Sequence, residues 1–280
     1  MDGSGIQIDD EEASTSSWES TDSDESYIAY ERLPVETFRR IERNDDSLRS
    51  LNIEPYHPNR IPPPENWVAL GRNLGRNSHM KNLTITTGCI DWEADGIASK
   101  ENMEAFCSGL SQNRSLEFLQ FDHFNFQQVR LETLHPFVMQ NNCLVDLQLH
   151  SSGLCTRDIE RLSSAFSQRN NPSSIKSIGI GGETINDDSV EAIVELCSWC
   201  PRLRKLDLDF SKIGSQGCNA LDLLLQHQNP KLRCLSIKHN KLGNEGALVL
   251  ATALINNKSL KRLGLREEKN FVWRGVSKKS

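Results

Sequence analysis

The chain has 280 residues, a formal net charge of −6 and 25% charged residues. It contains no run of about 18 apolar residues and no apolar stretch behind a basic N-terminal segment, so the sequence supports neither a transmembrane helix nor a secretory signal. Its eight cysteines are scattered along the chain, which is typical of a reducing compartment rather than of a disulfide framework. We therefore expect a cytoplasmic or nuclear protein without a membrane contact.

The first segment, residues 1–27, differs in composition from the rest. It holds nine acidic residues, repeated serine and threonine, and no lysine or arginine. Such a segment cannot bury enough apolar surface to offset the entropy lost on ordering, so a disordered acidic arm is predicted. Ser16 and Thr21 each precede an acidic residue by three positions, which suits an acidophilic kinase.

Residues 28–47 are predicted to form an N-terminal capping helix. Pro34 can begin a helix over residues 35–43, because its fixed φ suits the first turn. Phe38 and Ile41 would face inward, and Glu36 would lie near the positive helix start.

A short pattern then recurs eight times, at steps of 28 to 36 residues. Each unit has an apolar marker residue, followed by apolar residues three and five positions later, and in most units by a fourth at position +10. The markers are Leu48, Met80, Leu116, Leu144, Ile175, Leu203, Leu232 and Leu260.

The spacing inside each unit predicts a strand followed by a helix. Apolar residues at +3 and +5 alternate as in a strand that buries one side. Helix-period runs follow, for example Met103, Phe106, Cys107 and Leu110, or Leu248, Ala251 and Leu254. A strand and a helix repeated at constant pitch stack into a parallel sheet covered by helices, which is an α/β solenoid.

This pattern resembles the leucine-rich-repeat family, and the 28- to 29-residue step resembles its ribonuclease-inhibitor-like subclass. The resemblance covers about residues 34–265 and implies a horseshoe of about eight repeats over residues 48–268, with the parallel β-sheet on the concave face and helices on the convex face. The ninth slot of the repeat has asparagine only at Asn240, so we expect an irregular convex turn. Residues 269–280 form a basic C-terminal tail in which Phe271, Val272 and Trp273 can serve as a partial cap.

The outward slots at +2, +4 and +6 define the concave face as a candidate binding surface. Polar and small side chains dominate these columns, as suits an extended protein partner. Phe118 and Phe210 are the aromatic candidates for anchors, with packing under a neighbouring turn as the alternative. The candidate partner-binding residues are Phe118, Gln120, Asp122, Gln148, His150, Asp207, Asp209, Phe210, Lys238 and Arg266.

Other constellations are interpreted as structural. Cys197 and Cys200 have redox spacing, but no second pair follows at zinc spacing, so packing is predicted. The glycines between 179 and 182 lack the lysine of a phosphate loop and are expected to leave the concave face smooth. Asp122, His123 and His150 are interpreted as polar surface residues. The sequence thus predicts no catalytic residue, no metal site and no cofactor.

Function is expected to be non-enzymatic, as a protein-protein interaction module or scaffold. Two alternatives stay open. The repeat type resembles that of Ran GTPase-activating proteins, although their acidic segment is C-terminal. Leu33-Pro34-Val35-Glu36 resembles the opening of an F-box, which would imply a ubiquitin-ligase substrate receptor, although the prolines after residue 54 forbid the helix that should follow.

Charge is unevenly distributed along the chain. Residues 201–280 hold 16 basic and six acidic residues. An acidic partner, the acidic arm folding back, or simply solvated charge would each account for this excess. Nothing indicates nucleic-acid binding, and the sequence does not predict an oligomeric state.

Overall fold

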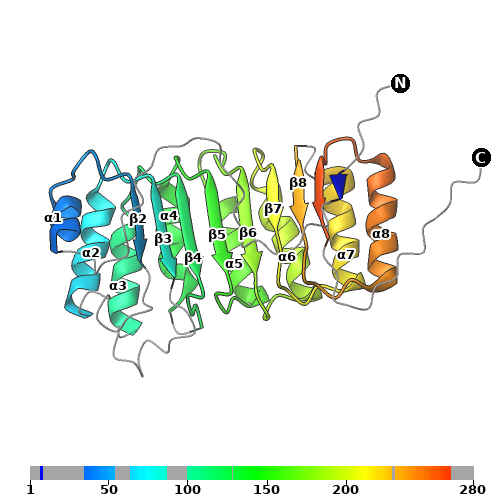
Figure 1. The fold of residues 1–280 in the computed structure, drawn as a ribbon, viewed down its shortest axis with the longest axis horizontal. Coiled ribbons are helices and arrows are strands. Elements are labelled where there is room, and N and C mark those ends of the chain that lie inside the picture. The colour runs from blue at the N-terminus through cyan, green and yellow to red at the C-terminus, as the bar shows by residue number, and fades with distance from the viewer. Residues whose placement is uncertain are drawn as a thin grey trace, which may run out of the picture.

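The structure is a computed structural model that describes residues 7–8, 35–53, 64–86, 100–127, 129–228 and 231–265. One open sheet of parallel strands forms one layer, and helices form the second layer along one of its faces (Figure 1). The strand order is β1-β9-β8-β7-β6-β5-β4-β3-β2, so consecutive repeats lie side by side. The predicted α/β solenoid is therefore confirmed.

All neighbouring strands are parallel and in the predicted register. The +3 residue of each repeat pairs with the +3 residue of the next, from Leu51 opposite Leu83 to Leu235 opposite Leu263. The strands are β1 (Gln7–Ile8), β2 (Ser50–Ile53), β3 (Asn82–Thr86), β4 (Phe118–Asp122), β5 (Asp146–His150), β6 (Ser177–Gly181), β7 (Lys205–Asp207), β8 (Cys234–Ser236) and β9 (Arg262–Gly264).

Helices return the chain from each strand to the next. Helix α1 begins at Val35, as predicted, and ends one residue earlier than expected; its Ile41 is buried and Phe38 packs against the core. The helices are α1 (Val35–Glu42), α2 (Pro64–Arg76), α3 (Lys100–Leu110), η1 (Leu131–Leu134), α4 (His135–Gln140), α5 (Thr156–Ser167), α6 (Asp187–Ser198), α7 (Ser215–Leu223), the π-helical η2 (Leu224–Gln228) and α8 (Gly243–Asn256). Helix α2 was absent from the periodic runs of the sequence.

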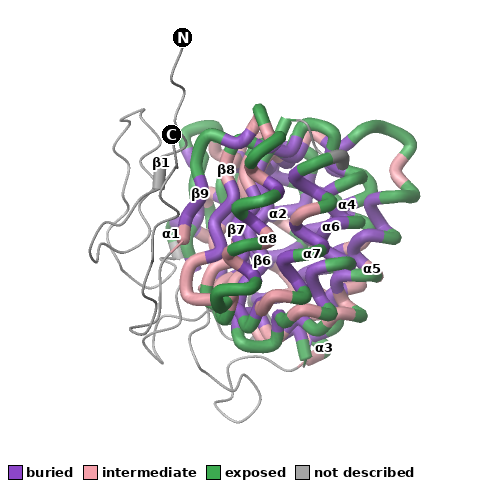
Figure 2. Tube along the Cα trace, turned by 90° about the vertical axis from the view of Figure 1, so that its right-hand side faces the viewer, coloured by how far each residue is buried: buried purple, intermediate pink, exposed green. Residues whose placement is uncertain are grey.

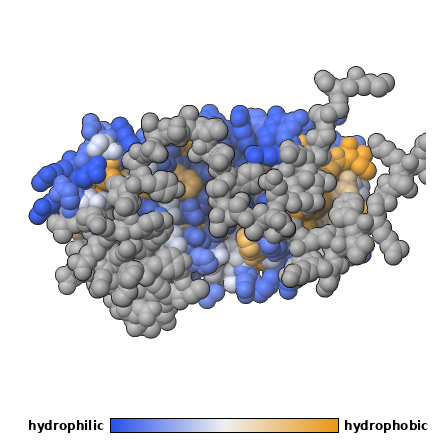
Figure 3. All heavy atoms as spheres, in the orientation of Figure 1, coloured by the Kyte–Doolittle hydropathy of each residue, from blue (hydrophilic) through white to orange (hydrophobic). Residues whose placement is uncertain are grey.

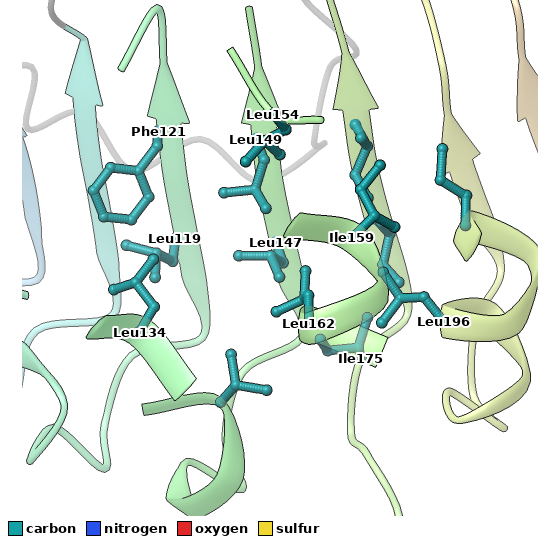
Figure 4. Close-up of a cluster of buried hydrophobic side chains, with 14 of the residues drawn as sticks. Leu119, Phe121, Leu134, Leu147, Leu149, Leu154, Ile159, Leu162, Ile175 and Leu196 are labelled. Atoms are coloured by element: carbon teal, nitrogen blue, oxygen red, sulfur yellow. The ribbon is translucent and has the colours of Figure 1, made fainter. Parts of the chain in front are cut away.

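The core fills the space between the sheet and the helices. All eight marker residues are at most 3% exposed, and the +3 residues are also buried. Buried positions alternate along β2, β3 and β4, whereas all of β6 is buried, and buried positions recur along the helices (Figure 2). In Figure 4 Leu147 and Leu149 of β5 lie with Ile159 and Leu162 of α5 in one such layer. Burying one such side chain contributes about 1.5–3 kcal/mol.

The buried side of α8 differs from the prediction. Leu248 is 67% exposed, whereas Gly246, Leu250 and Ala253 are buried. The helix rotates in this way because Gly246 lets it approach α7 closely: a Cβ at this position would lie 3.0 Å from the Cys218 sulfur. Leu248 and Ile255 consequently lie on the outer side of α8, exposed to solvent.

Asn240 is the asparagine of the ninth slot, and the irregular convex turn that the sequence predicts stays a prediction. Asn240 donates to the carbonyl of Leu208 and accepts from the amide of Ile213, which links two repeats. A second asparagine row, which the sequence analysis missed, lies three residues before five of the markers. Its described members are Asn77, Asn113, Asn141 and Asn257, and Asn229 lies outside the described residues.

Each described asparagine of this second row closes the turn into its strand. Asn113 accepts from the amides of Ser115 and Leu116, both at 2.8 Å, and donates to the carbonyls of Leu74 and Asn77. The same pattern at Asn141 reaches back to the carbonyls of Asn113 and Leu116. Buried backbone groups between repeats are thereby satisfied by side chains.

Helices α2 and α3 approach each other through glycines. A Cβ at Gly71 would lie 2.7 Å from the Cα of Phe106, and a Cβ at Gly109 would lie 2.6 Å from the amide nitrogen of Arg72. Trp67 and Phe106 make an edge-on ring contact at 5.4 Å beside this crossing. The backbones of α2 and α3 are therefore in direct contact at this crossing.

Burial governs the chemistry of the thiols. Burial raises the pKa of Cys107, Cys200 and Cys218 to about 12, and that of Cys197 well above its ordinary value. Cys200 occupies the slot three residues before Leu203, where other repeats have asparagine. This placement agrees with the packing interpretation of Cys197 and Cys200.

We expect the native protein to separate its cysteines into two classes. Cys143 and Cys155 are exposed and should react within minutes with iodoacetamide, whereas Cys107, Cys197 and Cys218 should react only on unfolding, because only the thiolate attacks and burial suppresses it. Mass-spectrometric mapping of labelled peptides, with and without urea, measures this. Equal native labelling of Cys197 and Cys143 would contradict it.

Several predictions concern residues outside the described ones: most of the acidic arm, the prolines between residues 54 and 63, and the C-terminal tail. Within the arm, Gln7–Ile8 is described, and it forms the strand β1 beside β9. None of the described helices is long and apolar enough to cross a membrane.

Candidate protein-binding face

The face of the sheet opposite the helices, which we call the open face, carries the +2, +4 and +6 side chains. The predicted residues fall into two groups on it. One group lies on β4 and β5 and the other on β7, β8 and the turns after these strands. Figure 3 shows mainly hydrophilic side chains on the described surface in this view, with hydrophobic ones gathered toward the end that holds α7 and α8.

The group on β4 and β5 is tied together by hydrogen bonds. Gln148 donates to Asp146 and, at 3.1 Å, to the Ser177 hydroxyl, while its carbonyl oxygen lies 2.7 Å from Nε2 of His150. Gln148 is therefore only 6% exposed. Its polar groups are largely occupied inside the protein.

The glycines of β6 leave room for the side chains of this network. A Cβ at Gly179 would meet Oε1 of Gln148 and lie 2.5 Å from Nε2 of His150, and one at Gly181 would meet the carbonyl oxygen of Asp209. All five residues of β6 are buried. The expected smooth patch is thus covered by side chains from the neighbouring strand, which need the glycines in order to lie across it.

Phe118, Gln120 and Asp122 complete the first group. Phe118 and Gln120 are half-buried on β4, and Asp122 lies 3.8 Å from Nε2 of His123. Phe124, in the turn after β4, is fully buried and packs against the rings of Phe121 and Phe126. It belongs to the core.

The second group centres on two carboxylates. Asp209 accepts from the Ser236 hydroxyl and from the amide of Lys238, both at 2.7 Å. Asp207 is 8% exposed and lies 3.7 Å from the Lys205 ammonium. Burial, together with the neighbouring Asp207 carboxylate, raises the pKa of Asp209 to about 6.

This raised pKa predicts a pH-dependent effect of Asp209→Asn. Between its ordinary pKa of 3.8 and about 6, the folded state binds a proton that the unfolded state releases, so the stability of the wild type falls as pH rises through this window. The asparagine keeps an oxygen for Ser236 and Lys238 and carries no charge. Relative to the wild type, the variant should therefore gain about 2–3 kcal/mol between pH 4 and pH 7.

Urea unfolding of both proteins at several pH values measures this difference. Lys241→Gln, an exposed change in charge away from the carboxylates, serves as the control and should show no comparable trend. A stability difference between Asp209→Asn and the wild type that stays constant from pH 4 to pH 7 would contradict the raised pKa.

Phe210 and His239 lie beside these carboxylates as a stacked pair. Their ring centroids are 4.4 Å apart and their planes differ by 11°. Both have left-handed backbone, with φ of 57° and 55°. Phe210 is 61% exposed.

The left-handed backbone is a feature of the repeat. It recurs seven residues after the marker in five consecutive units, at the end of each strand. The residues in this slot are His123, Ser151, Gly182, Phe210 and His239. Sequence reasoning missed His239 as a surface residue because this slot has no fixed residue type.

Lys238 and Arg266 are the remaining predicted residues. Lys238 is half-buried on the open face, with its amide bonded to Asp209. Arg266 lies outside the described residues. In the described part of the chain, no three His, Cys, Asp or Glu side chains are grouped so that they could hold a metal ion.

Comparisons with known proteins concern the fold. Residues 228–251 match the family model described as "Leucine Rich repeat". No curated protein sequence matches the chain significantly.

Solved structures with partial similarity include actin-binding site 2 of leiomodin-1, at 14% identity and a TM-score of 0.27 over 83% of this chain and 79% of that one. A Bacteroides fragilis protein has 16% identity and a TM-score of 0.31 over 71% and 68%. The C-terminal domain of a Caenorhabditis elegans tropomodulin has 13% identity and a TM-score of 0.27 over 84% and 83%. Similarity at this level does not assign a shared partner.

Eight strands in repeat register, the helices that return between them and the match of residues 228–251 lead to one conclusion about the fold. The chain has the fold of a leucine-rich-repeat solenoid.

Proposed function

We propose that this chain is a non-enzymatic, intracellular interaction module that binds a protein partner on its open face, with Phe210 and His239 as the anchor. The observation that carries the proposal is the exposure of Phe210, at 61%, on a left-handed backbone and against a second ring. A bulky residue in this conformation costs about 1–2 kcal/mol and its exposed ring gains nothing from burial.

Two properties of the pair suit recognition. Aromatic side chains provide most of the energy in many interfaces. The stack on His239 also holds the Phe210 ring in place before a partner arrives, which reduces the entropy lost on binding. A partner that covers both rings would bury apolar area that the free protein exposes.

The surroundings of the pair define the chemistry of the partner. Asp209 and Lys238 lie next to the rings, and Lys205 lies beside Asp207. An apolar centre with charges of both signs at its rim is the usual arrangement of a protein-protein interface. We therefore propose a partner that offers an apolar side chain flanked by polar groups, rather than a nucleic acid.

The test compares partners captured by variants of the full chain. Phe210→Asn and His239→Asn remove the rings while asparagine tolerates the left-handed backbone, so the fold is retained. Leu223→Gln, which removes a 52% exposed side chain from α7, is the matched control. Affinity purification with quantitative mass spectrometry should find a protein that Phe210→Asn loses at least tenfold and Leu223→Gln retains.

Identical sets of captured proteins for Phe210→Asn, Leu223→Gln and the wild type would overturn the proposal. The alternatives have their own readouts. A Ran-type regulator would accelerate GTP hydrolysis by a small GTPase, and a ubiquitin-ligase receptor would copurify the adaptor of the ligase. The proposed role predicts neither.

A further inference from the structure

The outer edge of β9, on the side away from β8, is a second surface of interest, separate from the open face. In the order of the sheet, β9 is the last strand of the repeats, and among the described residues β1 alone pairs with its outer edge. The amide of Arg262 bonds to Arg233, and the carbonyl of Gly264 accepts from Ile237, both on the inner side. Hydrogen-bonding groups alternate in direction along a parallel strand, so the amide and carbonyl of Leu263 face outward.

The segment that occupies this edge comes from the opposite end of the sequence. Gln7 pairs with Arg262 and Ile8 pairs with Leu263, in parallel register. In Figure 1 the short blue strand β1 lies beside the red strand β9. Ile8 thereby continues the row of +3 residues, which is apolar in every repeat.

We propose that the β9 edge is a strand-docking site and that its occupant is the chain's own N-terminal segment, bound in cis. Open edges of sheets accept extended segments through backbone hydrogen bonds, and the side chains select which segment binds. In this register Ile8 lies opposite Leu263. The basic surface around β9 would favour a segment whose isoleucine is followed by acidic residues.

Charge complementarity supports this occupant. Four acidic residues come directly after Ile8, at positions 9–12, and residues 1–27 carry no positive side chain. The last repeats display exposed lysine and arginine at both ends of these strands. Arg233, Lys258 and Lys261 lie before β8 and β9, Arg262 lies on β9, and Lys241 lies in the turn after β8. An acidic segment is held near such a surface by attraction that weakens with added salt.

The length of the chain allows binding in cis. Residue 35 begins α1, at the far end of the solenoid from β9 (Figure 1). Eight strand spacings separate β1 from β2, which is about 38 Å at about 4.8 Å each. The 26 residues from 9 to 34 can span up to about 90 Å.

The connection to the rest of the chain also explains how a strand of only two residues can occupy the β9 edge. So short a strand would bind weakly if it were a separate peptide. A tether of this length keeps the local concentration of the segment on the order of millimolar, so modest affinity suffices for binding in cis. A free segment of similar chemistry would have to compete against that concentration.

Hydrogen exchange at β9 tests the proposal in the full chain. The variant Gln7→Pro/Ile8→Pro removes two amide donors from β1. Exchange at the Leu263 amide should rise at least tenfold, while exchange in β4 to β6 stays unchanged. The matched control Gln7→Thr/Ile8→Val keeps strand-forming residues and should retain protection.

Rescue identifies the ligand. A synthetic peptide of residues 1–12, added to the double-proline variant at millimolar concentration, should restore protection at Leu263, and more weakly at 0.5 M salt. A scrambled peptide should not restore it. Protection at Leu263 that is equal in the double-proline variant and the wild type would overturn the proposal.

A second copy of the chain is the competing occupant. Sedimentation and exchange at several protein concentrations distinguish the two cases. Binding in cis gives a monomer whose Leu263 protection is independent of concentration. A dimer whose dissociation removes that protection would overturn binding in cis. These outcomes do not depend on the open face, so the partner-capture experiment with Phe210→Asn stands or fails separately.

Discussion

Replacing Gly71 by alanine is expected to lower the stability of the protein by about 3 kcal/mol, which corresponds to a fall of roughly 6–12 °C in melting temperature. Alanine favours a helix interior over glycine by about 1 kcal/mol, so helix propensity alone predicts the opposite sign. Packing decides the outcome. The added Cβ would lie 2.7 Å from the Cα of Phe106 and 2.9 Å from its carbonyl carbon.

These atoms belong to the backbone of α3 and cannot rotate away. Relief requires α2 and α3 to separate, which would weaken the contact between Trp67 and Phe106. Ser108→Ala, at an exposed position of α3, is the control and should change stability by less than about 0.5 kcal/mol. Urea unfolding measures both. An unchanged or raised midpoint for Gly71→Ala would contradict the close approach of these helices.

The second large effect is expected at Asn113. Asn113→Ala should destabilise the protein by about 3–5 kcal/mol, because it leaves the amides of Ser115 and Leu116 without their acceptor. It also removes one of two donors from the carbonyls of Leu74 and Asn77, which keep the Asn77 amide and the Ser115 hydroxyl respectively. Each unsatisfied buried group costs about 1–3 kcal/mol, and entry of water into the turn reduces the total.

The neighbouring Gln112 provides the control for this experiment. It is exposed, and Gln112→Ala should be neutral within about 0.5 kcal/mol. Asn113→Asp should fall between the two, because a carboxylate still accepts from the amides of Ser115 and Leu116 but cannot donate to the two carbonyls. Equal unfolding midpoints for Asn113→Ala and Gln112→Ala would contradict the role of this row of asparagines.

Much of the fold could be predicted because burial in a strand depends on spacing within a few residues. The apolar slots at +3 and +5 fix which side of each strand faces the helices, and they do so in every unit. The helix α8 shows the limit of this reasoning. Its sequence contains two apolar stripes, and either could face the core. The contact of Gly246 with Cys218 of the preceding repeat decides which stripe is buried.

The candidate site was predicted only in part for the same reason. The outward slots located the open face, but exposure there depends on how side chains of adjacent repeats bond to one another. The Gln148 side chain is hydrogen-bonded to Ser177 of β6 and His150 of β5, so its polar groups are less available to a partner. The anchor requires Phe210 and His239 in equivalent slots of consecutive repeats, and neither residue by itself signals a stack.

The row of asparagines that includes Asn113 could have been found. An asparagine three residues before the marker recurs in five of the eight units, and in the four that the structure describes it accepts from the two amides that lead into the strand. The resemblance drew attention to the ninth slot instead, where only Asn240 has the expected residue. Counting residue types at all slots before the strand would have revealed the second row.

Photo-crosslinking from the anchor tests the proposed function most directly. Benzoylphenylalanine placed at position 210 keeps an aromatic ring at the exposed site, and the same residue at position 223 of α7 reports on the helix side. Ultraviolet irradiation in cells should give a discrete crosslinked protein from position 210 that is absent from position 223 and is lost in His239→Asn. Crosslinks of equal pattern and yield from both positions would contradict a binding site on the open face.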